Sequence, residues 1–169
     1  MKSNSHIIKD NIFRIIILSD THSYLSPMIS NLINEDDYVI HAGDILDHEI
    51  LTNIKVMSRQ LYAVNGNNDD YNELNDVEII TTSIGNIVVT HGHKHYPDYH
   101  DSLRRAYPDA LIIIYGHTHH HTLDMAKKPY VVNPGAAGKT RTQGGASCII
   151  LSNSYDGFNL ELKKFNHGQ

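Results

Sequence analysis

Five short apolar runs, at residues 13–18, 38–42, 61–64, 87–89 and 111–115, each end at polar residues. Their lengths suit strands that are covered on both faces. Helical spacing follows the second run, where Ile50, Leu51 and Ile54 lie behind a candidate N-cap at Asp47. Strands that alternate with helices in this way predict a parallel sheet with crossover helices in the first half of the chain.

The second half predicts a different arrangement. Residues 77–83 and 87–90 form an expected hairpin around Gly85 and Asn86, and a helix is expected over residues 98–107. Short strands follow at 121–126, 130–133, 146–151 and 158–162, the last with the alternation of a half-buried antiparallel strand. We therefore expect an α/β fold with two sheets packed face to face and helices outside. The whole chain, 1–169, is expected to be one domain, with residues 1–11 as a loose N-terminal arm.

Composition narrows the classes of function. The formal charge is −5 and no basic block is present, which argues against nucleic acid as the main partner. No apolar run approaches the ~20 residues of a membrane span. A single cysteine, Cys148, and a polar start without a signal-peptide core favour a reducing compartment, the cytoplasm. A domain of this size needs no structural metal to fold, so any metal that its 13 histidines help to bind is expected to serve chemistry.

Ligand-type side chains follow the apolar runs directly. These side chains are Asp20, His22, Asp44, Asn67, His91, His117 and His119. Because ligands of open α/β sheets bind at the carboxyl ends of the strands, we expect these residues to converge there. Oxygen and imidazole donors without sulfur suit Mn²⁺, Fe²⁺, Zn²⁺ or Ni²⁺, whereas calcium and thiolate-seeking ions fit poorly.

The segments 19–22, 43–44, 66–69, 91–93 and 116–119, in this order, resemble the motifs of the calcineurin-like metallophosphoesterase superfamily. The resemblance runs from about residue 13 to residue 135, and the short length is similar to the compact bacterial and archaeal phosphodiesterase branch. It implies a four-layer α/β/β/α sandwich with a dinuclear metal centre. By motif, one ion would be held by Asp20, His22, Asp44 and His119, and the second by Asp44, Asn67, His91 and His117, so that Asp44 bridges the two.

The resemblance implies hydrolysis of a phosphodiester by in-line attack of a hydroxide that bridges two divalent ions, with Mn²⁺ preferred. The superfamily often has histidine after the motif asparagine, but this chain has Asn68, and an amide cannot act as a general acid near neutral pH. We therefore expect phosphodiesters or activated esters as substrates rather than alkyl phosphomonoesters. The expected catalytic residues are Asp44, Asn67, Asn68 and His93, with His93 as an alternative proton donor.

Several alternatives stay open at this point. A phosphomonoesterase or phosphoprotein phosphatase of the same superfamily, or a non-catalytic binding scaffold, would share these motifs. The expected partner is a small phosphodiester substrate, and the amphipathic C-terminal strand could pair copies into a homo-oligomer. His41 and Asp69 are expected to orient a ligand or bound water, with a core role as the alternative for His41. Ser23 replaces a usual glycine and should matter little, while Lys139 and Arg141 are interpreted as solvated, with substrate steering as the alternative.

Overall fold

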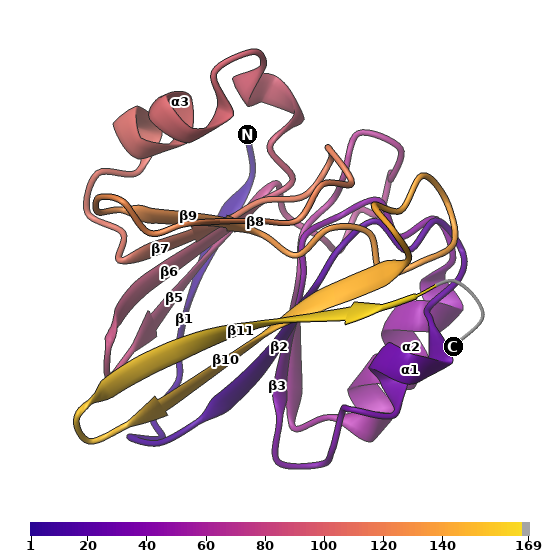
Figure 1. Cartoon of the computed structure of the whole chain (residues 1–169), viewed down its shortest axis with the longest axis horizontal. Coiled ribbons are helices and arrows are strands. Elements are labelled where there is room, and N and C mark those ends of the chain that lie inside the picture. The colour runs from indigo at the N-terminus through magenta and orange to yellow at the C-terminus, as the bar shows by residue number, and fades with distance from the viewer. Residues whose placement is uncertain (167–169) are drawn as a thin grey trace.

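Two mixed β-sheets pack face to face, with helices on both outer faces, in a computed structural model that describes residues 1–166 (Figure 1). One sheet has the order β11-β10-β2-β3-β4 and the other β1-β5-β6-β7-β9-β8. The first consists of β2 (Arg14–Leu18), β3 (Tyr38–His41), β4 (Gln60–Ala63), β10 (Ala146–Ser154) and β11 (Gly157–Phe165). The second consists of β1 (Ser3–Ile7), β5 (Val77–Thr82), β6 (Gly85–Thr90), β7 (Ile112–Ile114), β8 (Thr122–Asp124) and β9 (Tyr130–Asn133). The expected sandwich is confirmed.

Helices cover the outer faces of both sheets. The short α1 (Pro27–Ser30) and α2 (His48–Met57) lie on the five-stranded sheet, and α3 (Tyr99–Ala106) lies on the six-stranded sheet after a 3-10 turn, η1 (His93–His95) (Figure 1). Asp47 accepts a hydrogen bond from the backbone N–H of Glu49, so the expected cap of α2 is confirmed. The pairs β2–β3 and β3–β4 are parallel, as the strand–helix alternation predicts.

Alternation along β2 divides the core into layers. Ile15 and Ile17 face the other sheet, whereas Ile16 and Leu18 pack toward α1 and α2. A third cluster, which includes Leu103, lies beneath α3. Each fully buried isoleucine or leucine stabilises the fold by about 1.5–3 kcal/mol. The sandwich thereby holds its strand ends, and the loops that follow them, in fixed positions.

The expectation of a loose N-terminal arm is wrong for residues 3–7. These residues form β1, which pairs in parallel with β5 from Ser3 opposite Val77 to Ile7 opposite Thr81. His6 Nε2 lies 2.5 Å from Glu78 Oε2 and adds a side-chain contact. Because β1 is an edge strand held mainly by its backbone, its largely exposed side chains carry no apolar run that sequence could reveal.

The hairpin between β5 and β6 is present, but its turn differs from the expectation. The turn residues are Ser83 and Ile84, while Gly85 and Asn86 already pair with Thr82 and Thr81. Gly85 has a φ of 141°, which glycine adopts readily, and a Cβ there would lie 3.0 Å from the Cβ of Leu111. The glycine therefore serves the approach of a neighbouring segment rather than the turn.

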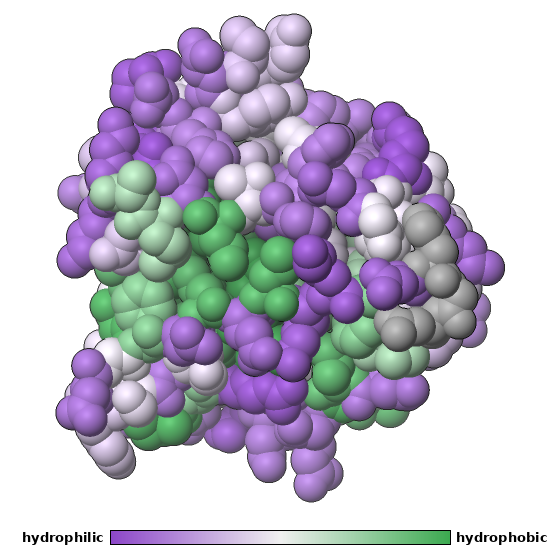
Figure 2. All heavy atoms as spheres, viewed as in Figure 1, coloured by the Kyte–Doolittle hydropathy of each residue, from purple (hydrophilic) through white to green (hydrophobic). Residues whose placement is uncertain are grey.

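Figure 2 shows hydrophobic side chains in the opening between β9 and β11, where the edges of the two sheets diverge. Partly buried residues that pack on the core between the sheets include Tyr130, Phe158, Leu160 and Leu162.

Within residues 1–166, no helix is both long and apolar enough to cross a membrane.

Candidate metal centre

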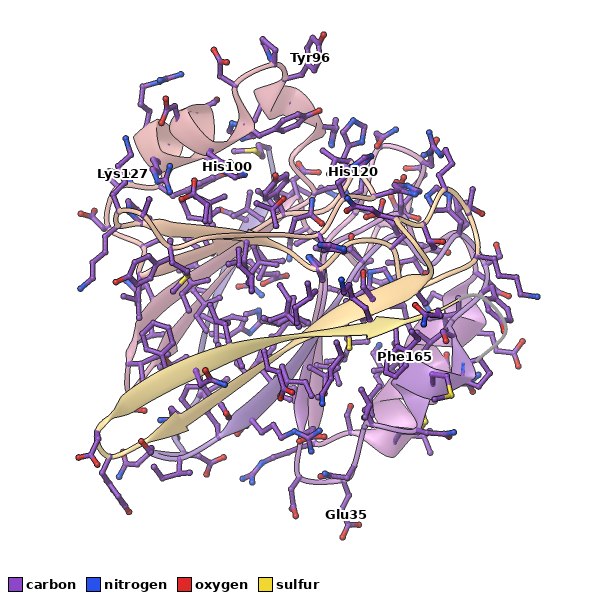
Figure 3. The ribbon with its side chains drawn as sticks, in the orientation of Figure 1. Glu35, Tyr96, His100, His120, Lys127 and Phe165 are labelled. Atoms are coloured by element: carbon purple, nitrogen blue, oxygen red, sulfur yellow. The ribbon has the colours of Figure 1, made fainter. Side chains whose placement is uncertain are left out.

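The expected ligands all lie in loops that follow strands. Asp20 and His22 follow β2, Asp44 follows β3, and the others come after β4, β6 and β7. Figure 3 labels His120, which succeeds the ligand candidate His119, near the loops at one end of the molecule, and Glu35 at the opposite end. The two sheets thus bring five loops from separate parts of the chain to one edge.

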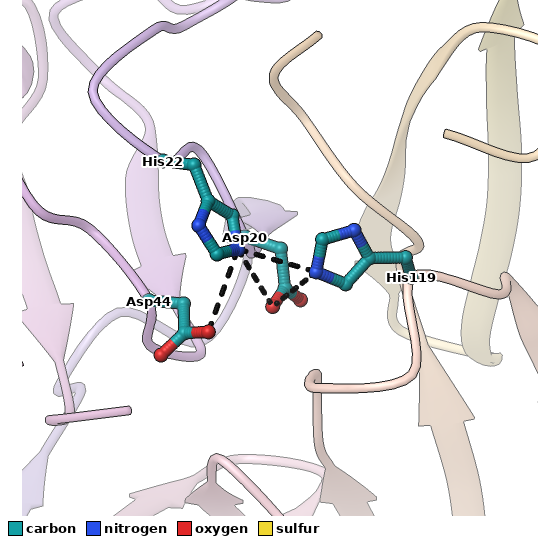
Figure 4. Close-up of side chains that lie close together, drawn as sticks. All are labelled: Asp20, His22, Asp44 and His119. Atoms are coloured by element: carbon teal, nitrogen blue, oxygen red, sulfur yellow. Dashed lines mark hydrogen bonds and ion pairs between the residues drawn. The ribbon is translucent and has the colours of Figure 1, made fainter. Parts of the chain in front are cut away.

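Four side chains form a compact group of donor atoms. Asp20, His22, Asp44 and His119 each place one atom within 4.8 Å of the others (Figure 4). His22 Nε2 lies 3.2 Å from His119 Nε2 and 3.4 Å from Asp44 Oδ2. Asp20 Oδ1 lies 3.3 Å from His119 Nε2. Two carboxylates and two imidazoles at this spacing match the ligands that sequence assigns to one ion.

Asp20 shows why this group fits a cation. Its Oδ2 accepts hydrogen bonds from Ser19 Oγ at 2.7 Å and from the backbone N–H of His117 at 3.1 Å. Its Oδ1 is buried and accepts no hydrogen bond from any residue that the structure describes. A buried carboxylate oxygen without a donor is costly. A divalent cation among these atoms would compensate for that cost, so the residues present fit the metal that the motif implies.

A second group lies on the other side of Asp44. Asn67 Oδ1 lies 3.0 Å from His91 Nε2 and 3.0 Å from His117 Nδ1, and His91 Nε2 lies 3.5 Å from Asp44 Oδ1. These four residues are the set that the family resemblance implies for a second ion. His91 is buried and Asn67 is exposed, so the group extends from the floor of the site to solvent.

Asp44 lies between the two groups and presents a different oxygen to each. Its Oδ2 faces His22, and its Oδ1 faces His91. Asn68 holds this carboxylate through its backbone N–H, 3.0 Å from Oδ1, and through its side-chain Nδ2, 2.8 Å from Oδ2. Burial opposes ionisation, but His91 and Asn68 outweigh it and hold the pKa of Asp44 well below its usual range. Asp44 is therefore an anion at neutral pH.

The imidazoles differ in how readily they take up a proton. Burial lowers the pKa of His22 and of His117, and a neutral imidazole is the form that binds metal. Burial also disfavours charge on His91 and His119, but nearby carboxylates, Asp44 for the first and Asp20 for the second, raise their pKa values. Each group thus combines one histidine whose pKa is lowered by burial with one histidine whose pKa is raised by a carboxylate.

Backbone carbonyl groups orient two of the histidines. His91 Nδ1 lies 2.7 Å from the carbonyl oxygen of Ala42, and His119 Nδ1 lies 2.9 Å from that of Thr140. With Nδ1–H donating, Nε2 of each ring carries the lone pair and points into the site. Sequence reasoning missed both partners, because every residue has a carbonyl group.

An unusual backbone conformation recurs at the expected ligands. Five of them have positive φ values between 44° and 68°, a region that non-glycine residues seldom adopt, and these are Asp20, His22, Asp44, His117 and His119. Ser23 has a φ of 68° as well. The glycine usual at that position would suit the backbone rather than the size of the site, so the expectation of little consequence overlooked the conformation of Ser23.

Asp69 does not contact a ligand side chain. Its carboxylate accepts hydrogen bonds from the backbone N–H groups of Ile45 (2.9 Å), Leu46 (3.0 Å) and Gly66 (2.8 Å). Two of these amides follow Asp44 and the third precedes Asn67. Asp69 therefore joins the two loops that carry these residues, a positioning role that differs from the expected contact with a ligand or water.

His41 belongs to the core. Its Nδ1 accepts a hydrogen bond from the N–H of Gly43 at 3.2 Å, and its Nε2 lies 3.0 Å from Thr21 Oγ1. Because the threonine hydroxyl donates to the carbonyl oxygen of Ile45, Nε2 carries the proton. Complete burial lowers the pKa of His41 to about 4. The alternative of a hydrogen-bonded core histidine describes it best.

Asn133 lies at the end of the strand expected over residues 130–133. It donates through Nδ2 to the carbonyl oxygen of Gly116 at 2.8 Å and so supports the loop of His117. The His93 ring lies 5.6 Å from the His91 ring and 6.1 Å from that of His117, between centroids. Burial and the neighbouring His91 lower the pKa of His93, so it is largely neutral at pH 7.

The sequence around this centre matches a known protein family. The description "Calcineurin-like phosphoesterase superfamily domain" matches residues 13–155, a span that contains both groups of ligand candidates. The chain belongs to the calcineurin-like phosphoesterase superfamily. Members of this superfamily bind divalent metal ions, and the Asp/His group around Asp20 is placed to hold one.

Relatives within the superfamily carry related names. A probable metallophosphoesterase of Methanocaldococcus jannaschii, MJ0623, is 32% identical over 128 residues, which are 71% of this chain and 66% of that protein, slightly under two thirds of its length. The phosphodiesterase MJ0936 of the same organism is 32% identical over 144 residues, 72% of this chain and 82% of that protein. These relatives indicate a hydrolase that acts on phosphoesters.

A solved structure shares the fold. Vacuolar protein sorting 29 from Cryptosporidium parvum superposes with a TM-score of 0.75 over 93% of this chain and 100% of its own, at 18% identity. At that identity the likeness concerns the fold alone.

Proposed function

We propose that this protein is a phosphodiesterase that depends on two divalent metal ions. The observation that carries the proposal is the place of Asp44, whose two oxygens face two separate groups of ligand-type residues. One carboxylate shared between two cations is the arrangement that two-metal hydrolases need. Mn²⁺ is the preferred ion, with Fe²⁺, Zn²⁺ and Ni²⁺ as alternatives, because the donors are oxygens and imidazoles.

When bound, the ions would supply Lewis acidity and a water activated at neutral pH. The chain's own contribution is placement. Asp20 and Asp44 are buried carboxyl groups, and two divalent ions bring more positive charge than two carboxylates would cancel, which leaves net positive charge for an anionic substrate. Asn67 is exposed and His117 is half-buried, so they form the rim where a phosphoryl group would enter.

The leaving group decides the substrate class. In hydrolysis, water oxygen bonds to phosphorus, the bond from phosphorus to the leaving oxygen breaks, and that oxygen must gain a proton. Asn68 is bound to Asp44 and carries no acidic proton, and His93 is largely neutral at pH 7. Substrates whose leaving oxygen needs little protonation therefore suit the site, which favours phosphodiesters with acidic alcohols over alkyl phosphomonoesters.

The deciding experiment is turnover of matched aryl phosphodiester and phosphomonoester substrates with Mn²⁺ added. We expect a higher kcat/KM for the diester, and a drop of more than about 100-fold in Asp44→Asn, because the shared anion is lost. Asp36→Asn, on an exposed loop away from the site, is the matched control and should keep full activity.

Other outcomes would favour the rival functions. A large preference for the monoester would contradict our interpretation of Asn68. A folded protein that retains its metal ions yet turns over neither substrate would favour a binding scaffold. We keep this rival function because the chain shares its fold with vacuolar protein sorting 29. We place the activity in the cytoplasm as part of this proposal, since Cys148 is a buried, unpaired thiol.

A further inference from the structure

Arg141 makes an unusual contact for an arginine. Its Nη2 lies 3.5 Å from Nε2 of His119, the nitrogen that faces the Asp20 group in Figure 4. Arg14, Arg59 and Arg104 all lie against carboxylates. Arg141 and Arg105 form no ion pair with any residue from 1 to 166, and of these two only Arg141 lies against a ligand candidate. An exposed guanidinium without a carboxylate partner thus lies at the edge of the metal centre.

The backbone fixes this placement. The carbonyl oxygen of Thr140, one residue earlier, accepts the hydrogen bond from His119 Nδ1 at 2.9 Å. Arg141 itself has a φ of 50°, a left-handed conformation that turns the chain sharply just after that anchor. The loop is therefore tied to His119 at two points, through the imidazole Nδ1 and through Nε2.

A metal ion and Arg141 would compete for the same nitrogen. Arginine remains protonated and can only donate, so its contact with His119 uses the Nε2 lone pair of the neutral imidazole. That lone pair is the one that would bind a cation. Once the cation is bound, the guanidinium must find another acceptor, and the bond from His119 to Thr140 keeps its loop near the centre.

We infer that Arg141 binds the phosphoryl oxygens of the substrate when the metal centre is loaded, an inference that rests on the proposed function. A guanidinium presents paired N–H groups whose geometry matches two oxygens of a phosphate. Among residues 1–166 no carboxylate forms an ion pair with this guanidinium, and a phosphoester held at the centre would bring such oxygens within reach. Arg141 is then a residue that binds the phosphoryl group of the substrate, rather than a solvated side chain.

Binding of inorganic phosphate to the Mn²⁺-loaded protein, measured by calorimetry, tests this role without turnover. In Arg141→Gln the Kd for phosphate should rise about 10- to 100-fold, as expected for loss of charge-assisted hydrogen bonds. Arg141→Lys keeps the positive charge but loses the paired N–H groups, so its Kd for phosphate should lie between those of the wild type and Arg141→Gln. Arg105→Gln removes an exposed charge from α3, on the outer face of the six-stranded sheet, and should leave the Kd unchanged.

Affinity for Mn²⁺ separates binding from a merely structural role. Arg141→Gln should bind Mn²⁺ at least as tightly as the wild type, because a competitor for Nε2 is gone. Unchanged phosphate affinity in Arg141→Gln, a parallel loss of Mn²⁺ affinity, or a loaded wild type that ignores phosphate would each overturn the inference. A wild type that binds phosphate through Arg141 but hydrolyses no phosphoester would refute the proposed function alone.

Discussion

Single residues in this site divide their polar atoms between the protein and the ligand position. Asp20 uses one oxygen to hold Ser19 and the loop of His117, and leaves the other unsatisfied. His119 likewise donates from Nδ1 to the carbonyl oxygen of Thr140 and directs Nε2 toward the metal centre. Because each side chain is fixed through one atom, its second atom is held in position before any ion arrives.

Ser23 illustrates a cost at the scale of one residue. Its φ of 68° disfavours a residue with a Cβ, and its side chain is exposed. Ser23→Gly should raise the free energy of unfolding of the metal-free protein by about 1 kcal/mol, because the strain disappears while little contact is lost. Denaturant titration measures the change. Ser30→Gly, within α1, is the control and should lower stability, so a fall in both variants would contradict the assignment of strain.

At the scale of elements, loops after strands carry the chemistry, and other loops brace them. Asp69 fastens the loop after β3 to the loop after β4 through three backbone amides. Asn133, at the end of β9, supports the loop after β7. The strands fix where each loop begins, and these braces fix where it goes next.

Removing one brace should loosen the centre without touching a ligand. In Asp69→Asn, the amide is a weaker acceptor for the three N–H groups, so Asp44 and Asn67 should lose their mutual placement. We expect Mn²⁺ affinity and phosphodiesterase activity to fall about 10- to 100-fold. Metal titration and kcat/KM measure both. Asp70→Asn, the exposed neighbour, should change neither, and an effect of equal size there would point to net charge instead.

The sequence predicts best those elements that are held by their side chains or that carry ligand-type side chains. The strands β2 and β3 are apolar on both faces, and the ligand candidates that follow them are recognisable by type and order. The edge strand β1 escaped prediction, since backbone pairing with β5 holds it and its side chains are mostly exposed. The partners of Asp69 and the carbonyl of Thr140 escaped for the same reason, because backbone groups are identical in every residue.

For the whole molecule, a buried neutral histidine links stability to pH. His41 is completely buried, and burial lowers its pKa to about 4 from the usual 6.5. Between these values the unfolded chain binds a proton that the folded protein does not, so stability falls as the pH drops from about 6.5 to about 4. The difference corresponds to at most about 3 kcal/mol.

The measurement is denaturant unfolding of the chelator-treated protein between pH 7.5 and pH 4. The wild type should lose up to about 3 kcal/mol more than His41→Gln over this range, although the variant should start from a lower stability at pH 7.5 because two hydrogen bonds change. Parallel curves for the two proteins would mean that His41 is not responsible for the acid sensitivity.

The left-handed backbone at five ligand candidates affects which substitutions this chain can accept over evolution. At each such position a substitution to glycine would discard a ligand candidate and relieve the backbone strain at the same time. A protein that no longer used the metal centre could therefore gain stability by losing its ligands. The survival of all five unfavourable positions in one chain is what continued use of the ions would leave behind.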